Sequence, residues 1–325
     1  MILDLLKNPL IFHPLVILGS FIILSKAADL AVEGIAGYAK KLGLSDYLIG
    51  LLVVSLASST PEFIASLNGL VLQDSGVVLG TIIGSNIIEL TLVLGVFALL
   101  GKKILLKAKA LEKTEWMIFG LGILPFAMLI DSKLSRIDGI ILMAAFFGYL
   151  YLIWRKEGSL GKIKKKVEVK HIYRDALIFV GALVAILLSS RWLVFSSVEL
   201  ANAINLSTFF IALVVIGIGA SIGDLIVGIR SVLRGHEDVG LGNAIGSNMT
   251  KSLFFLGIVA LISPISFAFS QLFVAVLFAA LSLGLILFFV KKRVLTWKQG
   301  IILLVIYAAF VILEWFIGGK AVGHI

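Results

Sequence analysis

The chain has 325 residues, of which 60% are hydrophobic and only 14% are charged. A soluble domain of this size would carry about 25% charged residues, so the composition excludes an ordinary soluble protein and indicates a membrane protein. The absence of cysteine excludes disulfides and thiolate metal sites. Despite the net charge of +9, we expect no nucleic-acid partner, because the basic residues lie mainly in short loops between apolar runs.

Long apolar runs predict an all-α integral membrane fold with ten transmembrane helices. The segment before the first run lacks the basic start of a cleaved signal peptide, so we expect that run to be a true span. In chain order the predicted spans are residues 12–37, 46–71, 76–100, 114–131, 135–154, 175–201, 207–230, 238–263, 267–290 and 297–317.

The basic residues indicate how the spans are oriented. With the N-terminus outside, 21 of the 28 basic residues fall in cytoplasmic loops and only four fall on the opposite side. This asymmetry follows the positive-inside rule. It predicts that both termini lie outside and that the basic linker at 155–174 lies in the cytoplasm, near anionic membrane lipid. We expect a prokaryotic plasma membrane.

The sequence repeats itself at an offset of 162 residues. Residues 79–86 read LGTIIGSN, and residues 241–248 read LGNAIGSN. At the same offset, STPE at 59–62 matches SIGD at 221–224. A duplication of this kind within apolar segments is typical of secondary transporters.

The linker separates two halves of five predicted spans each, residues 1–154 and residues 175–325. Because five is an odd number, the second half must enter the membrane in the opposite direction from the first. The sequence therefore predicts two inverted five-helix repeats that meet near the midplane of the membrane.

Spans 2, 3, 7 and 8 contain residues that weaken a helix near its centre. Pro61 cannot donate to the helix ladder, and its ring crowds the carbonyl of Ala57. Freed carbonyls in hydrocarbon need a partner, and a bound Na⁺ or Ca²⁺ can supply one. Alternatively, the glycines only permit close helix crossing. The weakening residues are Ser58, Ser59, Thr60 and Pro61; Gly80, Gly84 and Ser85; Gly217, Gly219 and Gly223; and Gly240, Gly242 and Gly246.

Four ionisable residues fall near span centres in two repeat-related pairs, Glu62 with Asp224 and Glu89 with Lys251. An unpaired charge in hydrocarbon costs several kcal/mol, so we expect all four to face one polar interior. Their formal charges sum to −2, which one Ca²⁺ bound by oxygen ligands would balance. No basic partner is evident for Glu62 and Asp224. The Glu89–Lys251 pair also admits a purely structural role, holding spans 3 and 8 together.

Hydroxyl side chains share helix faces with these charges and offer neutral oxygens. Ser85 lies four residues before Glu89, and Ser247 lies four residues before Lys251, so each pair is on one side of its helix. On span 2 one face carries Ser55, Ser58, Ser59, Glu62 and Ser66.

These motifs resemble the calcium:cation antiporter superfamily, and most closely its sodium/calcium exchanger branch. That family carries G-T-S-x-P-E on the second span of each half and G-S-N-x-x-(N/D) on the third. The matching segments here are ASSTPE at 57–62, GSNIIE at 84–89, GASIGD at 219–224 and GSNMTK at 246–251.

The resemblance implies a secondary antiporter that moves Ca²⁺ against Na⁺ or H⁺ by alternating access, with inorganic cations as its partners and no cofactor. Glu62 and Asp224 match the family's principal ligands. With the matched hydroxyls and their neighbours, the candidate metal ligands are Glu62, Asp224, Glu89, Ser58, Ser59, Ser85, Ser221, Ser247, Asn86 and Asn248.

Lys251 is the main departure from the family pattern, which has Asn or Asp at this position. Smaller departures are Gly223 opposite Pro61, Ala220 in a hydroxyl position and the shorter acid Asp224. We hypothesise that the Lys251 ammonium has a charge-compensating role. It either stands in for one co-ion or couples transport to H⁺ by gaining and losing a proton. A different cation substrate is a second possibility.

Three other functional classes compete with this interpretation. A non-transporting relative, a sensor or scaffold, would have its site closed by the Glu89–Lys251 pair. An intramembrane aspartyl protease would need paired carboxylates, such as Glu62 and Asp224, that share a proton. The inverted duplication has no reason to exist in such an enzyme, so we expect no enzyme. A primary pump is disfavoured because the chain has no nucleotide-binding motif.

Overall fold

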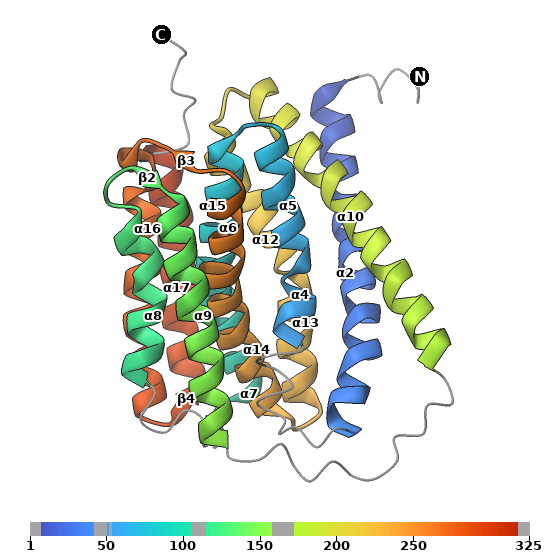
Figure 1. Ribbon diagram of the computed structural model, residues 1–325, viewed down its shortest axis with the longest axis vertical. Coiled ribbons are helices and arrows are strands. Elements are labelled where there is room, and N and C mark those ends of the chain that lie inside the picture. The colour runs from blue at the N-terminus through green and yellow to red at the C-terminus, as the bar shows by residue number, and fades with distance from the viewer. Residues whose placement is uncertain (1–7, 42–50, 52–53, 106–114, 158–171, 318–325) are drawn as a thin grey trace.

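Long helices run from one end of the protein to the other (Figure 1). The computed structural model describes residues 8–41, 51, 54–105, 115–157 and 172–317. Within these residues, eight helices are long and apolar enough to cross a membrane. They are Pro9–Ala27, Ser75–Gly101, Arg136–Ile153, Val180–Ala203, Thr208–Leu233, Glu237–Ile262, Phe269–Lys291 and Trp297–Ile317, with a shorter apolar helix at Trp116–Met128.

Several spans consist of consecutive helical segments with a change of helix type between them. The first half contains α2 (Pro9–Lys41), α4 (Ser55–Ser58), α5 (Thr60–Val71), α6 (Ser75–Ile88), the π-helical segment η2 (Glu89–Val93), α7 (Leu94–Gly101), β1 (Lys103–Leu105), α8 (Glu115–Met128), β2 (Lys133–Leu134) and α9 (Arg136–Glu157). The second half contains α10 (Ile172–Ala203), α11 (Thr208–Ile211), η4 (Ala212–Ile216), α12 (Gly217–Ala220), α13 (Ile222–Leu233), α14 (Glu237–Met249), η5 (Thr250–Phe255), α15 (Leu256–Ile262), β3 (Ile265–Ser266), α16 (Phe269–Lys291), β4 (Val294–Thr296) and α17 (Trp297–Ile317).

Within the described residues the helices overlap the predicted spans, and several of them run beyond the predicted ends. Helix α9 continues to Glu157 and α10 already begins at Ile172, so the ends predicted as linker are helical. Arg, Lys and Glu are good helix formers, which explains why α9 continues past the apolar run. Residues 46–50 and 52–53 of the second predicted span, and the basic run at 162–170, lie outside the described residues.

The matched helices of the two halves run in opposite directions. In Figure 1, α4 lies below α5 and α12 lies above α13, so spans 2 and 7 are antiparallel. Likewise α6 lies above α7, whereas α14 lies below α15. Helices α2 and α10 pack against each other as a slanted pair on one side of the bundle (Figure 1).

Two short strand pairs follow the same symmetry. The pair β1–β4 joins Lys103 to Thr296, and the pair β2–β3 joins Leu134 to Ile265. At the repeat offset of 162 residues, Lys103 corresponds to Ile265, and Thr296 corresponds to Leu134. One strand pair is therefore the repeat-related image of the other, at the opposite end of the bundle (Figure 1).

Side-chain caps fix where the central helices begin. Asp74 Oδ1 accepts hydrogen bonds from the Val77 backbone N–H (3.0 Å) and from Thr208 Oγ1 (3.1 Å). Ser207 Oγ accepts one from the Phe210 backbone N–H (3.1 Å). Such caps satisfy N–H groups that lack a partner in the first turn, and Asp74 also joins the starts of spans 3 and 7.

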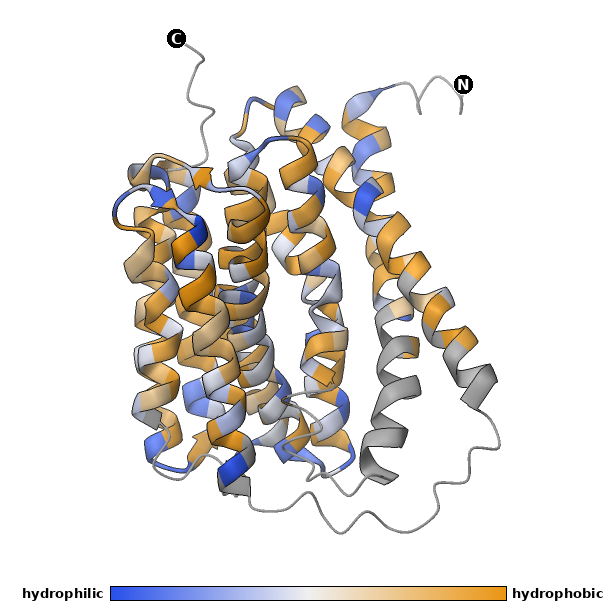
Figure 2. Ribbon diagram, viewed as in Figure 1, coloured by the Kyte–Doolittle hydropathy of each residue, from blue (hydrophilic) through white to orange (hydrophobic). Residues whose placement is uncertain are grey.

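The outer helices present apolar side chains, as the orange colour of much of α8, α9 and α10 shows (Figure 2). Large hydrophobic side chains such as Leu177 and Val305 are exposed, while buried polar residues gather on spans 2, 3, 7 and 8. An apolar exterior around a polar interior is the arrangement that a lipid environment requires.

Glycines in spans 3 and 8 let the central helices approach each other closely. A Cβ added at Gly80 would lie 2.7 Å from the Phe209 carbonyl oxygen. One added at Gly84 would lie 2.7 Å from Leu213 Cα, and one at Gly246 would lie 2.7 Å from Leu51 Cα. These glycines therefore serve tight helix crossing, the alternative that the sequence left open for them.

The Gly84→Ala variant is expected to lower the free energy of unfolding by about 1–3 kcal/mol, because its methyl group overlaps the backbone of Leu213. Gly284→Ala is the matched control, since a Cβ at that position of α16 meets nothing within 4 Å. Alanine's higher helix propensity should make the control neutral or slightly stabilising. Thermal unfolding in detergent compares the two, and equal midpoints would contradict the close crossing.

Candidate cation-binding site

Spans 2 and 7 break at repeat-related serines. Ser59 (φ −86°, ψ 0°) separates α4 from α5, and Ser221 (φ −79°, ψ 1°) separates α12 from α13. Pro61 lies in the first turn of α5, where a missing N–H costs nothing. The predicted interruptions of spans 2 and 7 are therefore confirmed, and each break starts a new helix beside an acidic residue.

Glu62 and Asp224 lie in the first turns of these new helices. The N-terminal end of a helix carries a partial positive charge, which favours a carboxylate there. The sequence thus places one acid of each half at a helix start inside the membrane.

In spans 3 and 8 the predicted breaks at the glycines are wrong. Helices α6 and α14 run unbroken past Gly84 and Gly246, because close packing against the facing helices outweighs the low helix propensity of glycine. The irregularity comes later, where the π-helical segments begin at Glu89 and at Thr250. Single π turns inside α-helices are frequent at functional sites.

The four charged residues converge on one point. Lys251 Nζ lies 2.5 Å from Glu89 Oε2, 3.6 Å from Glu62 Oε1 and 3.6 Å from Asp224 Oδ2. All four side chains have no exposed surface. The expectation that all four face one polar interior is confirmed. The expectation that Glu62 and Asp224 lack a basic partner is wrong, because the long lysine side chain reaches across from span 8.

Asp224 is held by neutral donors, whereas Glu62 is not. Asp224 Oδ1 accepts hydrogen bonds from Asn243 Nδ2 (2.9 Å) and from Ser247 Oγ (3.3 Å). Ser58 Oγ in turn donates to Asn243 Oδ1 (3.2 Å). Both oxygens of Glu62 are without a hydrogen-bond partner among the described residues. Asp224 is therefore fixed in orientation, while Glu62 retains open lone pairs.

Asn243 is the site residue that the candidate set missed. Its position in LGNAIGSN corresponds to Thr81 in the first copy, so a polar side chain at both repeat positions was the signal. Because Asn243 bonds Asp224 on one side and Ser58 on the other, it links spans 2, 7 and 8.

The remaining candidate hydroxyls differ in availability. Ser59 Oγ and Ser221 Oγ are buried and have no hydrogen-bond partner within the described part of the chain. Ser85 Oγ instead donates to the Ile82 carbonyl (3.1 Å). The two serines at the helix breaks therefore have the most available oxygens.

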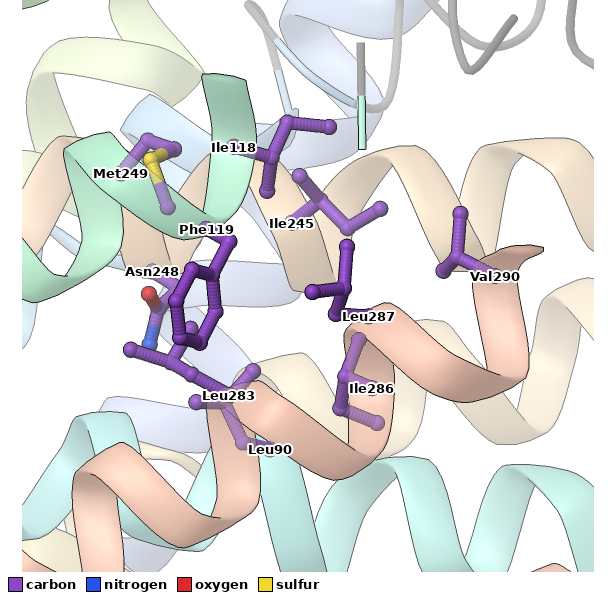
Figure 3. A pocket seen from close by; sticks show the side chains of 10 residues that line it. All are labelled: Leu90, Ile118, Phe119, Ile245, Asn248, Met249, Leu283, Ile286, Leu287 and Val290. Carbon is purple, nitrogen blue, oxygen red and sulfur yellow. The ribbon is translucent and has the colours of Figure 1, made fainter. Parts of the chain in front are cut away.

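The two candidate asparagines lie in unlike surroundings. Asn86 Nδ2 donates to Ser252 Oγ (2.7 Å). Asn248 lines a small cavity of about 20 Å³, room for about one water, whose other lining side chains are apolar (Figure 3). Leu90, the repeat counterpart of Ser252, is one of them. The structure therefore gives neither asparagine a hydrogen bond to the charged cluster.

The ammonium of Lys251 lies among the carboxylates. In the described residues, no three His, Cys, Asp or Glu side chains converge closely enough to hold a metal ion by themselves. The three acids and the lysine nevertheless leave a formal charge of −2 at the centre of the protein. A buried group of this charge is balanced either by bound cations or by protons on its carboxylates.

A family model for the sodium/calcium exchanger protein matches residues 12–155 and 175–316, which covers both halves of the chain. The chain belongs to this family. It is therefore a membrane cation antiporter by descent and not an enzyme, which removes the intramembrane protease from consideration.

Curated relatives and solved structures agree with the family. The putative antiporter CaxA of Alkalimonas amylolytica is 30% identical over 76% of this chain and 80% of its own length. The sodium/calcium exchanger MaX1 of Methanosarcina acetivorans is 25% identical over 93% of this chain and 98% of its own. A structure of the sodium-calcium exchanger NCX_Mj, soaked with 2.5 mM Na⁺ and 10 mM Sr²⁺, superposes with a TM-score of 0.72 at 25% identity. It covers 93% of this chain and 99% of that one.

In this family member, Asn243→Ala is expected to weaken apparent cation affinity by about 10–100-fold, the usual effect of losing a group that orients a ligand. The substitution removes the hydrogen bond that fixes Asp224. Thr81→Ala is the matched control, since Thr81 Oγ1 has no hydrogen-bond partner in the described ranges. The concentration dependence of cation uptake measures both variants, and equal effects would argue against the orienting role.

Proposed function

We propose that this protein exchanges Ca²⁺ for Na⁺ across the membrane at the buried charged cluster. The observation that carries the proposal is a set of three carboxylates and one ammonium, fully buried where four antiparallel repeat helices meet. The named activity of MaX1, a sodium/calcium exchanger that aligns over nearly the whole chain, supports this choice of ions.

The ligand set suits a hard cation. Glu62 offers two open carboxylate oxygens, Asp224 offers Oδ2, and Ser59 and Ser221 offer hydroxyl oxygens at the helix breaks. Ca²⁺ takes about six to eight oxygens of these kinds, with water completing the shell. Of the three acids, only Glu89 lies within hydrogen-bond distance of the Lys251 ammonium, so Lys251 adds charge without saturating the oxygens of Glu62 and Asp224.

Inverted repeats give the site a natural way to face either side of the membrane. Two halves of opposite orientation, residues 1–154 and 175–325, can rock around a fixed midplane site, which is the basis of alternating access. We propose ten spans, with both termini outside and the 155–174 segment on the cytoplasmic side of a prokaryotic plasma membrane. The positive-inside distribution of basic residues supports this orientation.

The test is Ca²⁺ uptake into proteoliposomes of the purified protein under an outward Na⁺ gradient, an outward H⁺ gradient, or neither. We expect the Na⁺ gradient to drive uptake and Glu62→Gln to abolish it. Uptake driven only by the H⁺ gradient would show that H⁺, and not Na⁺, is the coupling ion. If folded protein takes up no Ca²⁺ under any gradient, the proposal is overturned. The remaining interpretations are then a different cation substrate or a relative that does not transport.

A further inference from the structure

We infer that Lys251 sets the exchange ratio at two monovalent cations per divalent cation, so that transport moves no net charge across the membrane. The inference rests on the proposed function and specifies its stoichiometry. It starts from the four buried groups: with every carboxylate ionised, they sum to −2, where the acids alone would sum to −3.

The Lys251 ammonium stays paired with Glu89 while transported cations bind and leave. Its Nζ is 2.5 Å from Glu89 Oε2, and neither side chain has exposed surface, so the pair is shielded from water in this conformation. Separating a buried ion pair leaves two uncompensated charges, which costs far more than an exposed pair would. The ammonium therefore stays as a tethered cation while external cations come and go.

The remaining charge fixes how many external charges can be carried. A site that retains net charge is costly to occlude inside a membrane, so the loaded site favours a total charge of zero. Starting from −2, one Ca²⁺ or two Na⁺ reach that total. The empty site keeps its −2 charge, so the protein does not readily switch the empty site from one side of the membrane to the other. Because only the loaded site switches, the two ion flows are coupled.

The open oxygens match this count. Glu62 contributes two, Asp224 contributes Oδ2, and the hydroxyls of Ser59 and Ser221 add two more. Glu89, in contrast, holds the ammonium at Oε2, and its Oε1 has no hydrogen-bond partner among the described residues. These oxygens can divide between two small monovalent ions or gather around one divalent ion. A third monovalent ion would have to share Glu89 with the ammonium.

The consequence is measurable as voltage independence. With two Na⁺ per Ca²⁺, the Ca²⁺ ratio across the membrane follows the square of the Na⁺ ratio at every voltage. With a third Na⁺, one net charge moves per cycle, and about 100 mV would change the accumulated Ca²⁺ ratio by about 50-fold.

The experiment clamps proteoliposomes with K⁺ and valinomycin at zero or about ±100 mV and follows Na⁺-driven Ca²⁺ accumulation to steady state. We expect the same plateau at every potential for the natural protein. A plateau that shifts by about 50-fold per 100 mV overturns the inference while leaving Ca²⁺/Na⁺ exchange intact. Absence of Na⁺-driven uptake refutes the proposed function instead.

Two variants separate the charge count from other roles of Lys251. Lys251→Gln brings the cluster to −3, so its plateau should become voltage-dependent. Glu89→Gln combined with Lys251→Gln returns the cluster to −2 without the ion pair, so its plateau should again ignore voltage, whatever its rate. A double variant that is as voltage-dependent as the single one would contradict the charge count. If neither variant folds, the natural protein alone still decides.

Discussion

Asp224→Asn is expected to reduce Na⁺-driven Ca²⁺ uptake by at least about 100-fold, because a lost ligand costs more than a lost orienting partner. The replacement keeps the shape of the side chain. Its carbonyl oxygen can still accept from Asn243 and Ser247, as Asp224 Oδ1 does. The main change is one negative charge at a site whose charge sets the number of bound cations. Initial rates across a range of Ca²⁺ concentrations measure the loss.

Glu314→Gln is the matched control for this experiment. Glu314 is 1% exposed on α17, and its carboxylate oxygens have no hydrogen-bond partner among the residues that the structure describes. The substitution therefore also neutralises a buried acid in a membrane helix, but one outside the Lys251 cluster. We expect unchanged uptake in this variant. A loss as large as that of Asp224→Asn would mean that any buried acid matters and that the cluster has no special role.

Much of the fold could be predicted from the sequence because a membrane limits the choices. Apolar length locates the helices, and the offset of 162 residues, with five predicted spans in each half, implies inversion. The strand pairs β1–β4 and β2–β3 were not predicted. They are two or three residues long, and their register depends on partners distant in the sequence, so local patterning carries little signal for them.

The site was predictable in its members but not in its contacts. Charges at matched mid-span positions identified Glu62, Glu89, Asp224 and Lys251, since each is costly to bury alone. The sequence could not show that one ammonium would lie near all three carboxylates, because that depends on how far a flexible side chain reaches across four helices. The same limit explains why Asn243 was missed and why the glycines of spans 3 and 8 turned out to be packing residues.

Lys251→Met is expected to give the largest loss of stability, about 3–5 kcal/mol, because removing one partner of a buried ion pair leaves uncompensated charge. Lys251 neighbours three carboxylates, so its removal would leave all three facing one another with no cation among them. Methionine fills most of the same volume, so the change isolates charge from packing. Thermal unfolding in detergent without Ca²⁺ or Na⁺ measures the effect.

Adding Ca²⁺ should restore this variant more than it stabilises the natural protein. A ligand stabilises the state that binds it, and the −3 cluster gains more from a divalent ion than the −2 cluster does. Glu89→Gln combined with Lys251→Met should recover most of the lost stability without any ion, since it returns the charge to −2. If the double variant is instead as unstable as Lys251→Met, the Glu89–Lys251 pair acts mainly as a link between spans 3 and 8. Recovery would show that the lysine stabilises the protein as a permanent cation in a site built for exchangeable ones.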